Sequence, residues 1–172
     1  VFIVSIRKDL TALHKEYILP NKIPVTKNIK SIMDQKPIPE NLILDVEKRD
    51  VQYQKEVPEN YGSAFIPNLE ILALDLKSIF DSDKPIFSVE GLSCTLICKK
   101  DRVKILDPNL NAIRYLTALE LWRVMSFPDN LLDLVYSEIL SYNQIVNVTG
   151  NSIDLQQLKA LFCMLFDLEF KV

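Results

Sequence analysis

"SCTLICKKDRVKIL", residues 93–106, is the stretch that decides the predicted fold. Two apolar runs with β-branched residues flank the four charged residues "KKDR". This pattern is typical of a β-hairpin with an exposed polar turn. We therefore expect two antiparallel strands here, whose core-facing side chains are Cys94, Leu96, Cys98, Val103 and Ile105.

The two cysteines in this stretch, Cys94 and Cys98, raise the question of a metal or redox site. In a strand their Cα atoms lie roughly 13 Å apart, whereas a disulfide needs about 7 Å or less. Two thiolates at about 2.3 Å from one zinc ion cannot bridge that gap either. We interpret both cysteines as structural and predict no metal and no cofactor. The odd total of three cysteines favours a reducing compartment.

The composition of the 172 residues is that of a globular domain, with 48% hydrophobic and 25% charged residues. Only three glycines occur, so neither G-x-G-x-x-G nor the P-loop motif can be formed, which argues against those nucleotide sites. The net charge of −3 argues against a general attraction to nucleic acid. No apolar run approaches the roughly 18 residues of a membrane span. We expect a fragment of a longer intracellular protein, cytoplasmic or nuclear, because the chain begins at Val1.

The fold predicted for the whole chain is α+β. We expect a small, mainly antiparallel sheet covered by three to four apolar helices, within a single domain 1–172. Prolines punctuate residues 20–68, which we interpret as an extended arm, and 69–172 as the helical and hairpin core. The apolar periodicities predict helices at 9–19, 68–80, 108–127, 129–143 and 153–170, and further strands at 1–6, 86–91 and 144–149.

The densest basic cluster lies in and beside the predicted turn, at Lys99, Lys100, Arg102 and Lys104. Cations on a hairpin turn are suited to contacts with nucleic-acid phosphates. A solvated turn that discourages pairing between sheet edges explains the same pattern. The cluster is therefore a candidate nucleic-acid contact and the less favoured alternative.

The end of the last predicted helix is apolar around its whole circumference. Leu161, Phe162, Leu165 and Phe166 leave no polar face there, so they belong to a core or to a partner surface. Aromatic side chains that suit packing, within the domain or at a partner surface, are Trp122, Phe127, Tyr136 and Phe162.

Residues suited to acid–base or nucleophilic catalysis are scattered along the chain. His14 is the single histidine, and no cysteine or serine motif accompanies it. The paired carboxylates flank loops or chain ends, where charges are normally solvated, and they are Asp45/Glu47, Asp81/Asp83 and Asp167/Glu169. We predict no catalytic residue.

These observations together favour a non-catalytic protein–protein interaction domain, a scaffold or subunit of a larger intracellular assembly. Its partners would be proteins, in a homo- or hetero-oligomer, with no membrane involved. The alternative is a nucleic-acid-associated module that uses the basic turn at 99–104. An enzyme with a small-molecule pocket is the third hypothesis.

Overall fold

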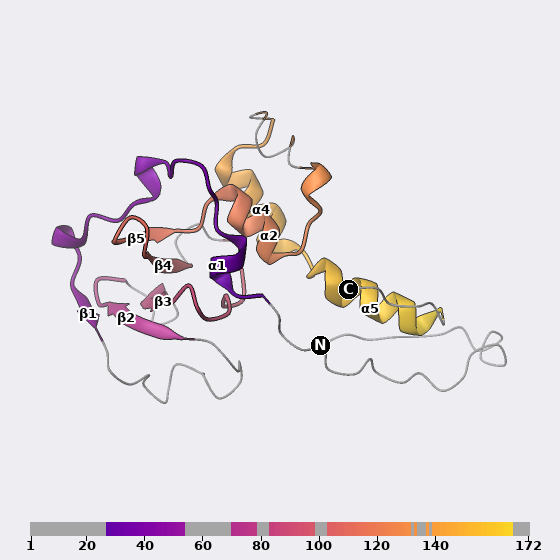
Figure 1. Cartoon of the computed structure of the whole chain (residues 1–172), viewed down its shortest axis with the longest axis horizontal. Coiled ribbons are helices and arrows are strands. Elements are labelled where there is room, and N and C mark those ends of the chain that lie inside the picture. The colour runs from indigo at the N-terminus through magenta and orange to yellow at the C-terminus, as the bar shows by residue number, and fades with distance from the viewer. Residues whose placement is uncertain are drawn as a thin grey trace. The chain divides into compact units, whose positions relative to one another are not determined.

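The computed structural model of the chain describes residues 27–53, 70–78, 83–98, 103–131, 133, 137 and 139–166 (Figure 1). The chain divides into two compact units. One unit spans Val25–Asp154, and the other combines Val1–Pro24 with Leu155–Val172. The predicted strand at 1–6 and helix at 9–19 lie outside the described residues.

The first unit is built on a five-stranded sheet with the strand order β1-β2-β3-β4-β5. Neighbouring strands are antiparallel except for β3 and β4, which run parallel, so the sheet is mixed. The chain must therefore cross back between β3 and β4 through residues 88–103. The strands are β1 (Val51–Tyr53), β2 (Ile71–Asp75), β3 (Pro85–Phe87), β4 (Lys104–Asp107) and β5 (Ala112–Tyr115).

The prediction of a mainly antiparallel sheet covered by three to four helices is wrong. The described helices of this unit are the single turn α1 (Ile29–Ile32), α2 (Ala118–Val124) and α4 (Tyr142–Asn151). Short 3₁₀ turns occur at η2 (Glu40–Leu42), η3 (Val46–Lys48) and η6 (Asp129–Leu131). The sheet, and not a layer of long helices, dominates this unit.

The helix predicted at 68–80 is in fact strand β2 where the structure describes it. Four of the five residues in β2 are buried, including both Ala73 and Leu74, which point to opposite faces. A strand covered on both faces reads as a continuous apolar run. Such a run cannot be distinguished from a buried helix by periodicity alone, which explains the error.

The predicted hairpin at 93–106 is replaced by a different one. Residues 92–97 form no regular strand, and β4 pairs with β3 on one side and β5 on the other. The turn that joins β4 to β5 is closed by the Asp107 side chain, whose Oδ1 accepts from Asn109 N at 2.8 Å. Asn111 adopts φ 48°, a left-handed conformation that asparagine tolerates better than most residues. The predicted helix at 108–127 therefore begins only at Ala118.

The described helices begin at well-formed N-caps, which explains why they start where they do. Thr117 caps α2 and Ser141 caps α4, each in a capping box with the residue three positions later. The strand predicted at 144–149 thus belongs to α4, and its buried residues Ile145, Val146 and Thr149 are at helical spacing. The last predicted helix contains α5 (Leu155–Leu165), which belongs to the other unit. No described helix is long and apolar enough to cross a membrane.

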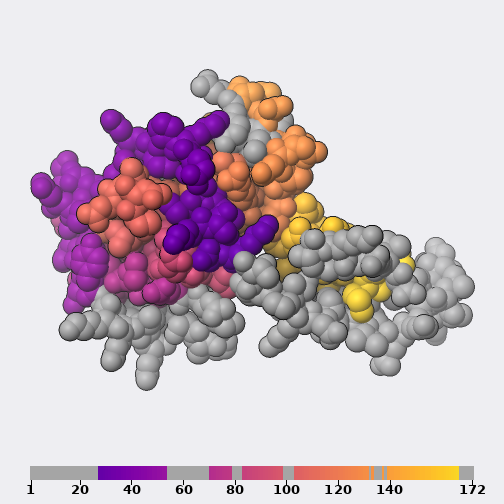
Figure 2. All heavy atoms as spheres, in the orientation of Figure 1, coloured from indigo at the N-terminus to yellow at the C-terminus, as the bar shows by residue number. Residues whose placement is uncertain are grey.

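The apolar side chains form two clusters in the first unit. The larger cluster joins α1, α2 and α4 to the strands through Ile29, Leu121 and Val146, among others. The smaller one contains Ala73, Ile86 and Ile113 and is covered by Leu44 and Val51. These covering residues come from the segment 27–53, whose indigo to purple atoms lie over much of the visible surface in Figure 2. Leu44 N also donates to Ile113 O at 2.9 Å, so this segment extends the sheet.

Gly150 in α4 allows the helix to approach the backbone that precedes the basic segment 99–102. A Cβ at this position would lie 2.3 Å from the carbonyl carbon of Ile97 and 2.4 Å from Cys98 N. We expect Gly150→Ala to lower the free energy of unfolding by about 2 kcal/mol, because overpacking outweighs the better helix propensity of alanine. Urea unfolding measures this, and the exposed Asn147→Ala in the same helix is the control. An unchanged midpoint for Gly150→Ala would show that the backbone at 97–98 yields.

Candidate functional site

The largest fully buried side chain among the described residues is that of Arg114 in β5. Its Nε donates to Asp107 Oδ2 at 2.6 Å, and its two terminal nitrogens donate to the Glu120 carboxylate at 2.7 and 2.8 Å. The three side chains are at most 2% exposed. Burial opposes the charge of Arg114, but the hydrogen bonds and charges of Glu120 and Asp107 outweigh it. The pKa of Arg114 is therefore raised.

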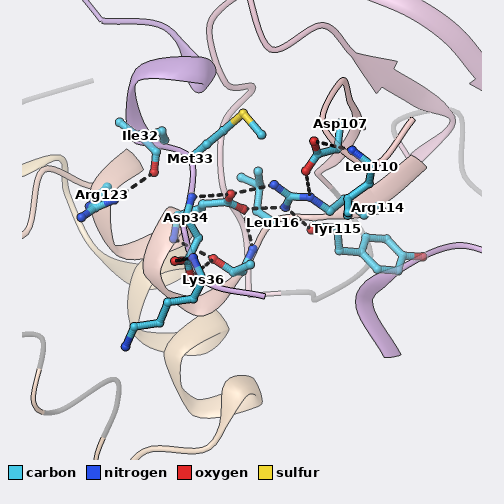
Figure 3. A network of polar contacts seen from close by, with 12 residues as sticks. Ile32, Met33, Asp34, Lys36, Asp107, Leu110, Arg114, Tyr115, Leu116 and Arg123 are labelled. Carbon is cyan, nitrogen blue, oxygen red and sulfur yellow. Dashed lines mark hydrogen bonds and ion pairs between the residues drawn. The ribbon is translucent and has the colours of Figure 1, made fainter. Parts of the chain in front are cut away.

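Glu120 connects Arg114 to two further segments of the chain. Its carboxylate accepts from Thr117 N at 2.7 Å and from Asp34 N at 2.9 Å. Thr117 Oγ1 in turn accepts from Glu120 N, which completes the capping box of α2. Figure 3 shows Arg114 reaching from Asp107 toward the chain at Asp34. The network therefore fixes the β4–β5 turn, the start of α2 and the segment after α1 against one another.

A second buried cluster lies at the start of β4. Lys104 Nζ donates to Asp75 Oδ2 at 2.7 Å, to Ser78 Oγ at 2.6 Å and to the carbonyl of Asp83 at 2.6 Å. Arg49 Nη1 donates to the same oxygen of Asp75 at 2.9 Å. Burial works against the charge of Asp75, but the hydrogen bond and charge of Lys104, with Ser78 and Arg49, lower its pKa overall. Burial lowers the pKa of Lys104, and Asp75 only partly offsets this effect.

Of the predicted basic cluster, the structure describes Lys104 alone. Lys104 is 1% exposed and its ammonium is used inside the fold, which differs from the predicted contact with nucleic acid. Lys99, Lys100 and Arg102 lie outside the described residues. The two flanks of their segment are fixed, because Val103 is buried in the larger apolar cluster and Cys98 lies against Gly150.

The cysteines do not form a site. Cys94 is half-buried, Cys98 is exposed and Cys163 is buried, and no disulfide joins them in the described structure. The prediction that Cys98 faces the core is wrong, because residues 92–97 form no strand that would direct it inward. Among the described residues, no three or more histidine, cysteine, aspartate or glutamate side chains gather in a way that suits a metal ion.

The paired carboxylates have separate environments where the structure describes them. Asp45 forms an exposed ion pair with Lys48 at 2.6 Å, and the hydrogen bond and charge of Lys48 outweigh a slight effect of burial and lower its pKa. Glu47 is exposed and Asp83 is buried. His14, Asp81, Asp167 and Glu169 lie outside the described residues.

The predicted partner surface lies on α5 and the residue after it. Phe162 and Phe166 are 48% and 57% exposed, and their rings stack with centroids 6.1 Å apart. Leu161 and Leu165 are half-buried. Trp122, by contrast, is buried and packs against Phe127 at 4.6 Å, so it serves the interior of the first unit. Tyr136 lies outside the described residues.

Comparison with known proteins identifies the family. The chain matches the C-5 cytosine-specific DNA methylase family over residues 1–166, and it belongs to that family. No curated protein matches it. The family is one of methyltransferases that modify DNA, so the prediction of a non-catalytic interaction domain, scaffold or complex subunit is wrong, as is the prediction that the protein is not an enzyme. DNA is the partner that the family suggests.

The residues that organise the two buried clusters were not identified from the sequence. Arg114 and Glu120 lay inside a predicted helix, and Asp75 lay inside another. One sequence feature did indicate where α2 starts, because Thr117-x-x-Glu120 has the spacing of a capping box. That spacing would have separated β5 from α2.

Removal of the Arg114 guanidinium leaves two buried carboxylates without their cation. We expect Arg114→Met to lower the free energy of unfolding by about 3–5 kcal/mol, measured by urea denaturation. Lys30→Met is the control, because the Lys30–Glu90 pair at 2.6 Å is more than half exposed on both side chains. The control should change stability by less than about 1 kcal/mol. Equal effects of the two substitutions would contradict the role of Arg114.

The lowered pKa of Asp75 predicts a specific acid sensitivity. A carboxylate whose folded pKa lies below its usual value of 3.8 stabilises the fold above that pH. This stabilisation is lost as the pH falls through the folded pKa. The difference in unfolding free energy between the wild type and Asp75→Asn should therefore shrink from about pH 4 to about pH 2. Asp45→Asn, at an exposed ion pair, should show little difference across the same range, and a constant Asp75→Asn difference would refute the prediction.

Proposed function

We propose that this chain supplies the DNA-contacting part of a methyltransferase that adds a methyl group to C5 of cytosine in DNA. Lys99, Lys100 and Arg102 would contact the phosphates and hold the duplex. Family membership supports the methylation reaction. The three cations within residues 99–102 support this segment as the DNA contact. Because the substrate is DNA, the protein would act inside cells, in the cytoplasm or the nucleus.

The observation that supports this assignment is the contact of the two residues on either side of the segment 99–102 with the rest of the unit. Val103 enters the core directly after it, and Lys104, the next residue, donates three buried hydrogen bonds. Cys98, directly before it, lies against the helix at Gly150. Cys98 and Val103 thus have described contacts on either side of the three cations in the sequence.

The chemistry of the reaction explains why a firm hold on the DNA backbone is needed. Methyltransferases that act on a base rotate it out of the duplex, which costs a few kcal/mol of stacking and pairing. Contacts to phosphates fix the register of the protein on the duplex while this happens. The methyl group itself comes from a donor that the reaction consumes. The roles proposed for the residues of this chain are to bind and to position the DNA.

A neutral triple variant tests the proposed role of the segment. We expect Lys99→Gln/Lys100→Gln/Arg102→Gln to weaken binding of the full chain to duplex DNA and to lower the salt dependence. Each lost phosphate contact reduces the slope of log K against log salt by about 0.9. Lys27→Gln/Lys30→Gln/Lys36→Gln removes the same charge elsewhere and is the control. If both triple variants bind as the wild type does, the segment does not contact the DNA.

A further inference from the structure

One segment of the first unit follows both outer edges of the sheet. Residues 27–53 begin just before α1 and end with β1, which pairs with β2 at one edge. On the way, Ile43 bridges to Arg114 at the outer edge of β5. Leu44 N donates to Ile113 O at 2.9 Å at the same edge. In Figure 1 the segment runs, in indigo to purple, from α1 past β5 to β1. The strands β2 to β5 are therefore flanked on both sides by one continuous stretch of chain.

The short connection between the two edges indicates that the sheet curls. Adjacent strands lie about 4.8 Å apart, so in a flat sheet Leu44, beside β5, would lie roughly 24 Å from β1. The chain from Leu44 to Val51 includes the 3₁₀ turn η3, which rises only about 2.0 Å per residue, so it reaches roughly 20 Å. Leu44 and Val51 accordingly pack against the same small apolar cluster of Ala73, Ile86 and Ile113. The segment thus closes a curled sheet from the outside.

The middle of this segment, residues 35–48, is attached through few buried side chains, and we call it the strap. Within the strap Leu42 is buried, Ile38 and Leu44 are half-buried, and the other residues are exposed. Its regular structure consists of the short turns η2 and η3 and the bridge at Ile43. Few buried apolar groups and exposed backbone are the properties of regions that open at low free energy.

The fold fixes the chain at both ends of the strap. Before it, Met33 is buried in the larger apolar cluster and Asp34 N donates to Glu120 Oε1 at 2.9 Å. After it, Arg49 Nη1 donates to the buried Asp75 Oδ2 at 2.9 Å, and β1 follows. A movement of the chain between these two attachments is therefore confined to the strap.

Release of the strap leaves no charge unpaired in the interior. Its charged residues are all exposed, and they are Lys36, Glu40, Asp45, Glu47 and Lys48. Lys77 Nζ donates to the carbonyl of Lys48 at 2.7 Å, at an exposed position where water can replace the bond. Buried charges that lose their partners are the costly ones, and the strap contains none. The main costs of release are the exposure of Leu42 and the loss of the hydrogen bond to Ile113 O.

We propose that the strap detaches from the outer edge of β5 as a local unit, while the sheet and helices of the first unit stay folded. Detachment uncovers the carbonyl of Ile113 and the part of the small apolar cluster that Leu44 covers. A strand edge uncovered in this way is a template for pairing with another extended chain. The strap is thus a conformational device that hides or presents this edge, independently of the proposed function.

Amide hydrogen exchange of the full chain tests the strap, because the Leu44 amide is protected by its bond to Ile113 O. We expect this amide to exchange faster than the slowest amides of β4, since local opening exposes it without unfolding. Ile105→Val lies in the larger cluster, away from the strap, and should speed the slowest β4 amides about fivefold. The Leu44 amide should keep its wild-type rate in this variant, because Ile105 stays packed when the strap opens.

Leu42→Ala removes the buried side chain of the strap and should speed exchange at Leu44 by about 30-fold or more. Val46→Ala, at an exposed position of the same strap, is the matched control and should leave the rate unchanged. Two results would overturn the inference. One is a wild-type Leu44 amide that exchanges no faster than the slowest β4 amides, and the other is equal acceleration of both by Ile105→Val. A Leu44 rate that Leu42→Ala does not change would also contradict it.

Discussion

The buried ion pair between Arg114 and Glu120 is the interaction on which the arrangement of the first unit depends. A guanidinium at 0% exposure is tolerated only when carboxylates and carbonyls satisfy it, and here Asp107 and Glu120 do so. Because Glu120 also accepts from the backbone at Thr117 and Asp34, a single carboxylate links β5 and the start of α2 to a segment that is 86 positions away in sequence. Buried pairs of this kind add little net stability compared with apolar side chains of the same size. They disfavour other packings of the chain, because a wrong packing would leave a charge unpaired in the interior.

The two buried clusters also explain how a strand of only four residues is held. β4 begins with Lys104, which is fixed by Asp75, and it ends with Asp107, which is fixed by Arg114. Both ends of the strand are therefore attached to different neighbours: β2 at one end and β5 at the other. Val103, which directly precedes this strand, is buried in the larger apolar cluster and adds a further contact at its start.

The sequence predicted some features of this fold and could not predict others. Val103 and Ile105 were expected in the core and are buried, in line with the high frequency at which valine and isoleucine are buried. The helix predicted over β2 failed because a strand buried on both faces has no alternation to reveal it. Lys104 was interpreted as a surface cation because nothing near it in the sequence shows that Asp75, 29 positions earlier, accepts a hydrogen bond from its ammonium. Local patterns identify apolar residues, whereas buried charges are explained by partners from elsewhere in the chain.

The same limit applies to function, because composition reports the sum of charges and DNA binding depends on where they lie. A net charge of −3 argued against nucleic acid, yet the chain belongs to a family of DNA methylases. The Debye length at physiological salt is about 8 Å, so a phosphate at one edge is largely screened from charges across the sheet. An acidic protein can therefore bind DNA through a local group of cations although its net charge is negative.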